Sequence, residues 1–250
     1  MKVVRYLQGT VVSHGILEAE TISPISGDIF GSHIIEDKKV SLSDVSLLAP
    51  IVPGKIIGMG INYHDFCKVM GLSEPSTPYI FLKAPTSVIA PGESVVIPHP
   101  DHIVNFEAEL AVVIGNISKN VAAKDALKNI FGYTIANDMT NRTDLLRDNH
   151  MGVAKNYDAF LPLGPAIETQ YDWQNKRISM ELNGVIKIDG NTNDMIFKLS
   201  EQISFISSIM TLYPGDVILT GCPAGATSIK VGDTMKIYIE GLGTLCNPVT

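Results

Sequence analysis

One segment of the chain, residues 106–114, constrains the fold more than any other. It reads FEAELAVVI, and its last five residues, Leu110–Ile114, are apolar at every position. A strand that is apolar on both faces is usually buried on both. Just before this run, Glu107 and Glu109 lie two residues apart, so in a strand their side chains point the same way. The sequence therefore predicts a buried central strand whose two glutamates open into a pocket.

These two carboxylates make a candidate metal site. Two anions held close together in a poorly solvated place need either a cation or a proton. The alternative is an antiparallel strand with one wet face, in which Phe106, Ala108 and Leu110 face the core and both glutamates face water. The apolar continuation of the strand favours the pocket over the wet face.

Composition and charge exclude several classes of partner. The 250 residues contain 19 Lys and Arg against 26 Asp and Glu, a formal net charge of −7, and no block of basic residues. Nucleic acid and membranes are therefore not expected partners. Three widely spaced cysteines, Cys67, Cys222 and Cys246, suggest neither a disulfide framework nor a zinc motif and favour a cytoplasmic protein. The first 12 residues lack the apolar core of a signal peptide, so no leader and no membrane span are expected.

The sequence predicts two regions and a mainly β, α+β fold. Residues 1–50 alternate short apolar runs with turn residues, which indicates a small β-rich segment, and residues 51–250 form the main body. Strands outnumber helices, which favours this class over a doubly wound sheet. The elements expected in the main body are strands at Lys55–Ile61 and Tyr79–Lys83, helices at Asn62–Met70 (stopped by Gly71), Ala122–Ile130 and Ser200–Leu212 (capped by Ser200), and hairpins turning at Pro91-Gly92 and Asn183-Gly184.

A third carboxylate follows the next expected strand. Tyr133–Ala136 should be a strand, and Asp138 lies where it ends and where a polar helix could begin near Thr140. Three carboxylates are hard oxygen donors, which suit Mg²⁺, Mn²⁺ or Ca²⁺ and leave positions open for water or substrate. The alternative is that Asp138 only caps the helix.

Several motifs agree in order and spacing with one known superfamily. They are a Glu-x-Glu-Leu strand, an Asn-Asp-Met-Thr-x-Arg segment, Ala-Lys-Asn-Tyr-Asp with Pro-Leu-Gly-Pro, and Asn-Gly followed by Asp-Gly-Asn-Thr, together with IFLKAP, DMIFKL and PGDVILTG. From Lys55 to Val249 the chain resembles the fumarylacetoacetate hydrolase superfamily. The resemblance implies a mixed β-roll catalytic domain, usually a homodimer, with Mg²⁺ or Mn²⁺ held by Glu107, Glu109 and Asp138.

The resemblance also implies a reaction class and further site residues. Members act on 2-oxo acids and related dicarbonyls by hydrolysis, decarboxylation, isomerisation or hydration. In each reaction the metal stabilises an enolate of the substrate. By the same resemblance Lys155 reaches the substrate carboxylate, Arg142 supplies a second positive contact, and Lys83 lines the same pocket. A lysine near a cation can also lose its proton, so Lys155 is a candidate catalytic base as well. Outside this pattern, lysines and arginines are usually solvated surface residues.

The chain departs from the family pattern at the segment that activates water. Family hydrolases carry a histidine and a glutamate on a lid after an Asn-Tyr pair, and here those positions hold Phe66 and Val69. His64 lies two residues early, which turns it roughly 200° away on a helix. A rescue by His64 and Asp65 is therefore a secondary hypothesis, and the alternative for His64 is an exposed lid residue.

Three other matched positions make the predicted pocket less polar. Leu145 and Ile188 stand where polar residues are expected, and Cys222 replaces a threonine that would face the substrate. Cys222 is either a reactive thiol next to the cation or a buried, inert one. The leading hypothesis is a metal-dependent enzyme that acts on a small 2-oxo acid or dicarboxylate through an enolate, without water activation. The alternatives are a carbon–carbon hydrolase of acylpyruvates and a catalytically silent homologue that binds metal and carboxylate.

Overall fold

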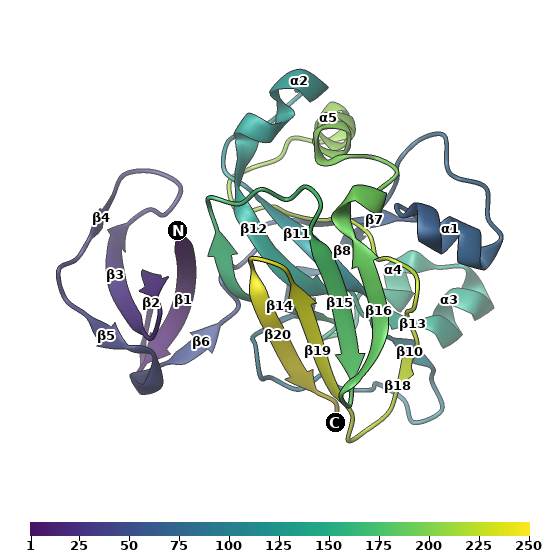
Figure 1. The fold of residues 1–250 in the computed structure, drawn as a ribbon, viewed down its shortest axis with the longest axis horizontal. Coiled ribbons are helices and arrows are strands. Elements are labelled where there is room, and N and C mark those ends of the chain that lie inside the picture. Colours follow the sequence, from purple (N-terminus) through teal and green to yellow (C-terminus); the bar gives the residue numbers. More distant parts are fainter.

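The structure is a computed structural model that describes residues 1–250, apart from the side chain of Asp148. It confirms the predicted class, a mainly β, α+β fold with a large mixed sheet and two smaller sheets. In Figure 1 the first strands form one end of the molecule, and the later strands and all labelled helices form the larger body.

The largest sheet has 13 strands and runs through the whole molecule. Its main path, in spatial order, is β4 (His33–Ile35), β3 (Thr21–Gly27), β2 (Val11–Glu18), β1 (Lys2–Gln8), β14 (Leu161–Glu168), β12 (Ile130–Asn137), β11 (Ala108–Ile114), β17 (Val217–Leu219), β7 (Ile56–Gly60) and β8 (Tyr79–Lys83). Three short strands pair off this path, namely β5 (Val40–Ser41), β6 (Ser46–Leu48) and β9 (Val88–Ile89).

Two smaller sheets and short helices complete the larger body. The three-stranded sheet has the order β13 (Thr140–Asn141), β10 (Val104–Asn105) and β18 (Ser228–Ile229). The four-stranded sheet has the order β16 (Val185–Asn191), β15 (Arg177–Leu182), β19 (Thr234–Ile239) and β20 (Gly243–Pro248). The α-helices are α1 (His64–Met70), α2 (Ala123–Ala126), α3 (Arg142–Asp148), α4 (Met151–Ala154) and α5 (Leu199–Ile209), and 3-10 turns lie at Leu42–Asp44, Pro85–Ser87, Leu127–Asn129 and Thr192–Asp194.

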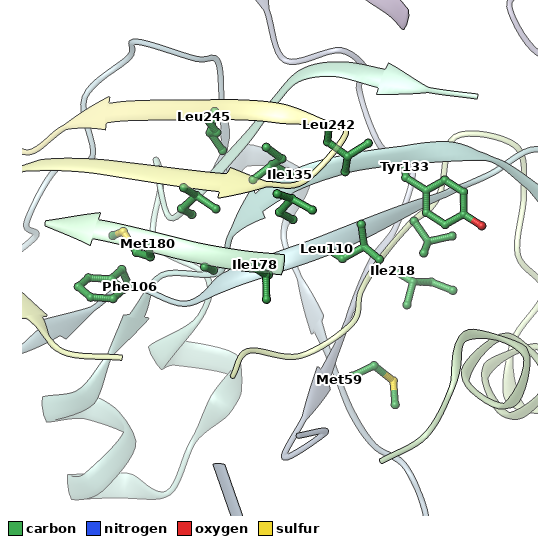
Figure 2. Close-up of a cluster of buried hydrophobic side chains, with 14 of the residues drawn as sticks. Met59, Phe106, Leu110, Tyr133, Ile135, Ile178, Met180, Ile218, Leu242 and Leu245 are labelled. Carbon is green, nitrogen blue, oxygen red and sulfur yellow. The ribbon is translucent and has the colours of Figure 1, made fainter. Parts of the chain in front are cut away.

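Strand β11 is buried along its whole length, as its sequence predicts. Leu110, Val112 and Ile114 pack into the main core, where they face the four-stranded sheet and α5. Ala111 and Val113 point the other way, into a second core shared with β14 and β1. Figure 2 shows Leu110 in the main core among residues from β12, β15 and β17. This double burial leaves the end of β11 that carries the glutamates surrounded by protein.

The first six strands form a small core together with Ala166 of β14. Val4, Tyr6, Ile22 and Val40 are its largest buried members. The segment joins the main body through antiparallel pairing of β1 with β14, with Lys2 opposite Glu168. We propose that the boundary between this N-terminal segment and the main body lies near residue 50. None of the described helices is both long enough and apolar enough to cross a membrane.

Local turn chemistry predicted one hairpin correctly and one wrongly. Asn183 and Gly184 both have positive φ, 53° and 78°, and they join β15 to β16 as a two-residue hairpin loop. The Pro91-Gly92 turn exists but makes no hairpin, because its flanks pair with other segments. Strand β9 pairs in parallel with β14, and the Gly92 N–H donates to the Cys246 carbonyl at 2.9 Å.

The helix predictions were right in place but not at every end. Gly71 ends α1 in the left-handed conformation, as predicted, with φ 64°. The predicted helix at 122–130 is shorter, because strand β12 already begins at Ile130 and pairs there with Ile114. The prediction of Ser200 as an N-cap was wrong: α5 begins at Leu199, and the Glu201 carboxylate accepts a hydrogen bond from the Lys198 N–H at 2.8 Å.

Candidate active site

The three predicted metal ligands meet where β11 and β12 pair. Glu107 precedes β11, Glu109 belongs to it, and Asp138 follows β12. Register brings them together, because Ala108 pairs with Asn137 and the Asp138 N–H donates to the Glu107 carbonyl at 2.9 Å. One carboxylate oxygen of each residue lies within 4.8 Å of the others. The wet-face alternative does not describe this site, since Glu109 is 1% exposed and Asp138 is fully buried.

Two buried lysines contact these carboxylates. The Lys155 ammonium lies 2.8 Å from Glu107 Oε2 and 2.7 Å from Asp138 Oδ2. The Lys83 ammonium lies 2.8 Å from Asp138 Oδ1 and donates to the carbonyls of Met139 and Lys155. The Lys83 side chain has no exposed surface. In the metal-free protein Lys83 therefore holds the Asp138 carboxylate.

Burial and neighbouring charges shift the ionisation of this set in different directions. Burial alone would raise the pKa of Asp138, but the charges of Lys155 and Lys83 bring it below its usual value. Burial would likewise lower the pKa of Lys155, yet the three carboxylates raise it above that of a free lysine. Burial raises the pKa of Glu109 well above its usual range, and Asp138 and Glu107 raise it further. Among the described residues, Glu109 is the carboxylate of the set that has no ammonium within ion-pair distance.

A glycine lets the backbone reach Glu109. The Gly221 N–H donates to Glu109 Oε2 at 2.7 Å, and Gly221 has a φ of 97°, which other residues rarely adopt. A Cβ at this position would lie 2.8 Å from the Asn62 Cβ. The Asn62 amide also donates to the Thr220 carbonyl at 2.7 Å, and its oxygen accepts from the Phe197 N–H at 2.8 Å. Asn62 thus fixes the turn that supports Glu109.

The donor set fits a hard divalent cation. Three carboxylates face two ammonium groups, so the site has one excess negative charge when all five groups are ionised. Mg²⁺ and Mn²⁺ prefer carboxylate oxygens and keep part of their coordination for water or substrate. Asp138 Oδ1 is buried and lies 2.8 Å from the Lys83 ammonium, and a carboxylate oxygen can accept a further partner beside such an ion pair.

Arg142 is the first residue of α3 and is half-buried. Its N–H donates to the Ile103 carbonyl at 2.7 Å, and its guanidinium has no hydrogen-bond or ion-pair partner among the described residues. A half-buried guanidinium in this state suits an incoming carboxylate. The N-cap of α3 is Asn141, whose side chain accepts from the Asp144 N–H at 3.2 Å. Asp138 therefore does not cap this helix.

The two lid positions that carry an acid and a base in family hydrolases hold apolar side chains here. His64 is 46% exposed and contacts Glu74, with 2.5 Å between His64 Nδ1 and Glu74 Oε1. Phe66 packs against the main core, and Val69 is 70% exposed. Among the described side chains, the cluster that could hold a metal contains no histidine. The exposure of His64 agrees with the alternative that it is an exposed lid residue.

Cys222 lies on the wall of the site next to the two glutamates. Burial raises the pKa of the Cys222 thiol well above its usual value, and the charges of Glu107 and Glu109 raise it further. The thiol donates to the Pro223 carbonyl, with a sulfur–oxygen distance of 3.2 Å. A thiol in this state is a poor nucleophile. Its proximity to the glutamates agrees with a role in shaping the pocket.

Sequence reasoning missed two residues of this region, Asn62 and Tyr63. In the sequence this Asn-Tyr pair only marks the start of the lid segment. The turn support by Asn62 depends on contacts with residues more than 130 positions away. The Tyr63 hydroxyl is buried without a hydrogen-bond partner among the described residues. No sequence pattern marks either property.

The fold and the carboxylate cluster agree with what the comparisons find. A family model described as the C-terminal domain of fumarylacetoacetate (FAA) hydrolase matches residues 55–250, and one described as Rv2993c-like, N-terminal, matches residues 1–50. The chain belongs to the fumarylacetoacetate hydrolase family.

Relatives from bacteria and animals cover most of the chain. Protein Rv2993c of Mycobacterium tuberculosis is 42% identical over 92% of this chain and 88% of its own length. The human mitochondrial protein named oxaloacetate tautomerase FAHD2A is 40% identical over 83% of this chain and 70% of its own length. The structure of a 2-hydroxyhepta-2,4-diene-1,7-dioate isomerase from Mycobacterium marinum superimposes with a TM-score of 0.93 at 38% identity, covering 100% of this chain and 98% of that one.

Proposed function

We propose that this protein is a divalent-metal-dependent enzyme that isomerises a small 2-oxo acid between its keto and enol forms. The observation that carries the proposal is the buried cluster of Glu107, Glu109 and Asp138 with its two lysines. These three carboxylates would hold Mg²⁺ or Mn²⁺. When bound, the cation supplies positive charge next to the ketone oxygen of the substrate, where negative charge develops.

The charges of the site suit a substrate with one carboxylate at the metal end. A divalent cation turns the excess negative charge of the site into one excess positive charge, which a single carboxylate of a 2-oxo acid neutralises. In the metal-free site burial lowers the pKa of Lys155, and the neighbouring carboxylates raise it more strongly. A cation on the same carboxylates would act in the opposite direction. Lys155 would therefore bind and orient the substrate anion and is also the candidate base. The guanidinium of Arg142 would receive the second carboxylate of a dicarboxylate substrate.

The lid supports isomerisation over hydrolysis. Carbon–carbon hydrolysis needs a group that activates water, and Phe66 and Val69 cannot transfer a proton. Keto–enol isomerisation moves a proton from the carbon next to the ketone to the ketone oxygen and needs no activated water. Lys155, which contacts Glu107 and Asp138, is the group that would carry this proton. The names of the relatives, an oxaloacetate tautomerase and a dienoate isomerase, agree with this choice. The same proposal includes a homodimer, which analytical sedimentation tests. It also includes a cytoplasmic location, which cell fractionation tests.

The proposal predicts Mg²⁺-dependent equilibration of enol and keto oxaloacetate. Ultraviolet absorbance of the enol follows the reaction, and EDTA should reduce the rate to that of buffer, because removal of the cation removes its transition-state stabilisation. The same enzyme should cleave an acylpyruvate at least about 100-fold more slowly than it isomerises oxaloacetate. A missing acid–base group costs a factor of this order.

Other outcomes of this assay would favour the alternatives. Faster cleavage of the acylpyruvate than isomerisation of oxaloacetate would favour the hydrolase. No turnover of either compound, combined with a Mg²⁺-dependent rise in melting temperature on adding oxalate, would favour a catalytically silent binding protein. A metal-independent isomerisation would contradict the proposal itself.

A further inference from the structure

Strand β8 ends the main path of the large sheet, and among the described strands only β7 pairs with it. The backbone groups on its other edge therefore need partners from outside the sheet. The side chain of Asn156 supplies such partners. Its amide oxygen accepts a hydrogen bond from the Ala84 N–H, and its amide nitrogen donates to the Leu82 carbonyl at 3.2 Å. One side chain thus binds the backbone on both sides of Lys83.

The same amide also binds the segment that carries the other buried lysine. Asn156 directly follows Lys155, the C-cap of α4. The amide nitrogen of Asn156 donates a second hydrogen bond to the Gly152 carbonyl in α4, at 3.1 Å. The Lys83 ammonium adds another link between the two segments by donating to the Lys155 carbonyl. Strand β8 and the end of α4 are therefore joined at the residues next to both lysines.

This junction bears on where the Lys155 ammonium lies. The ammonium is 2.8 Å from Glu107 Oε2 and 2.7 Å from Asp138 Oδ2, next to β11 and β12. It also lies 5.0 Å from the centre of the Phe81 ring in β8, a cation–π distance. The ring has room because its partner in β7 is Gly58, where a Cβ would lie 2.2 Å from it. The ammonium therefore contacts both the carboxylates and β8.

Helix α4 cannot hold its own end rigidly. It has only four residues, Met151–Ala154, and helices this short are not stable by themselves. Lys155 has a long side chain with many rotamers, so its ammonium stays in one place only if the backbone below it is fixed. The three hydrogen bonds of the Asn156 amide provide this fixation, since they attach the end of α4 to the large sheet.

We propose that Asn156 is a positioning residue for the reaction. By attaching the end of α4 to β8, it holds the Lys155 ammonium against the carboxylates and the Phe81 ring. The inference rests on the proposed function and adds to it a residue that acts through Lys155. Asn156 transfers no proton itself. Misplacing a reacting group by about 1 Å can cost about 100-fold in rate, so loss of Asn156 should lower turnover rather than metal binding.

The test compares Asn156→Ala and Asn156→Asp with wild type at saturating Mg²⁺. Alanine removes all three hydrogen bonds of the amide. Aspartate keeps the shape and the bond from the Ala84 N–H but loses both donated bonds, so it serves if the alanine variant does not fold. In both variants kcat for isomerisation of oxaloacetate should fall about 10–100-fold, with a smaller change in KM. Affinity for Mg²⁺, measured by titration calorimetry, should not fall, because β11 and β12 position the three carboxylates.

Asn183→Ala is the matched control. The Asn183 amide also joins two distant segments, since its oxygen accepts from the Thr234 N–H at 2.9 Å and its nitrogen donates to Asp233 Oδ1 at 2.8 Å. These bonds lie at the hairpin between β15 and β16, and neither partner belongs to the candidate active site. The control should lower the melting temperature while kcat, measured well below that temperature, stays that of wild type.

Each outcome decides the proposal. A lower kcat in the Asn156 variants, with Mg²⁺ affinity retained and kcat unchanged in Asn183→Ala, supports it. A wild-type kcat in folded Asn156 variants overturns it and leaves the amide a purely structural role. A rise in KM alone, or a loss of Mg²⁺ affinity, overturns it as well, because neither reports the placement of the reacting group. If wild type itself shows no Mg²⁺-dependent isomerisation, the proposed function fails together with this inference.

Discussion

Replacing Glu109 with glutamine should abolish the thermal stabilisation that Mg²⁺ gives the protein while leaving its fold intact. Glutamine has the same shape and can still accept the hydrogen bond from the Gly221 N–H. It removes one of three ligand charges, however. Groups that only orient metal ligands are worth about 10–100-fold in metal affinity, so the loss of a ligand itself should cost at least about 100-fold. Turnover with Mg²⁺ should fall by a similar factor or more.

The same variant should be at least as stable as wild type when no metal is present. The pKa of Glu109 is raised in the folded protein, so folded Glu109 resists ionisation. The unfolded chain ionises near its ordinary pKa of about 4.3, so wild type loses stability as the pH rises from there toward the raised folded pKa. Glutamine does not titrate and avoids this loss near neutral pH.

Melting curves in EDTA and in Mg²⁺ measure both effects. Glu181→Gln is the control, because Glu181 is also a strand glutamate. Its side chain is 36% exposed, and its ion pair with Lys236 is long, with 4.0 Å between the charged atoms. It should keep the full response to Mg²⁺. A Glu109→Gln protein that Mg²⁺ stabilises as much as wild type would remove Glu109 from the metal site.

Replacing Lys155 with methionine should have the largest effect on stability. The substitution leaves Glu107 and Asp138 without the ammonium that lies within 2.8 Å of each. Removing one partner of a buried ion pair typically costs about 3–5 kcal/mol. For a chain of this size, each kcal/mol lowers the melting temperature by about 2–4 °C. In EDTA the variant should melt about 6–20 °C below wild type.

Mg²⁺ should restore part of this loss. The cation supplies positive charge to the carboxylates that have lost their lysine, so it should raise the melting temperature of Lys155→Met more than that of wild type. Turnover should stay low, because the group that binds the substrate anion is missing. Lys128→Met is the control, since the Lys128–Asp125 pair is exposed and such pairs contribute at most about 1 kcal/mol. Equal stability of Lys155→Met and wild type in EDTA would contradict the charge balance described for the site.

The carboxylate cluster was predictable because it depends on local spacing. Glu107 and Glu109 lie two residues apart at the start of β11, and Asp138 directly follows β12, the strand that pairs with β11. The Asn183-Gly184 hairpin was predictable for the same reason, since a two-residue loop determines its own pairing. Such features need only neighbours in sequence or one antiparallel register.

Features that depend on distant segments were not predictable from the chain alone. The Pro91-Gly92 turn resembles a hairpin loop, yet its partners lie in β14 and near Cys246. The contact of Lys83 with Asp138 depends on β8 at the edge of the large sheet, and no local pattern encodes that contact. The unpartnered hydroxyl of Tyr63 is a property of packing, which no residue pattern encodes.

A crystal structure of the protein grown with Mn²⁺ and oxalate tests the central claim most directly. The anomalous scattering of manganese locates the ion independently of how the surrounding side chains are interpreted. The account predicts one strong anomalous peak in contact with carboxylate oxygens of Glu107, Glu109 and Asp138, and oxalate next to it. A fully occupied ion elsewhere, or no peak while the Lys155 ammonium stays between Glu107 and Asp138, would contradict the account.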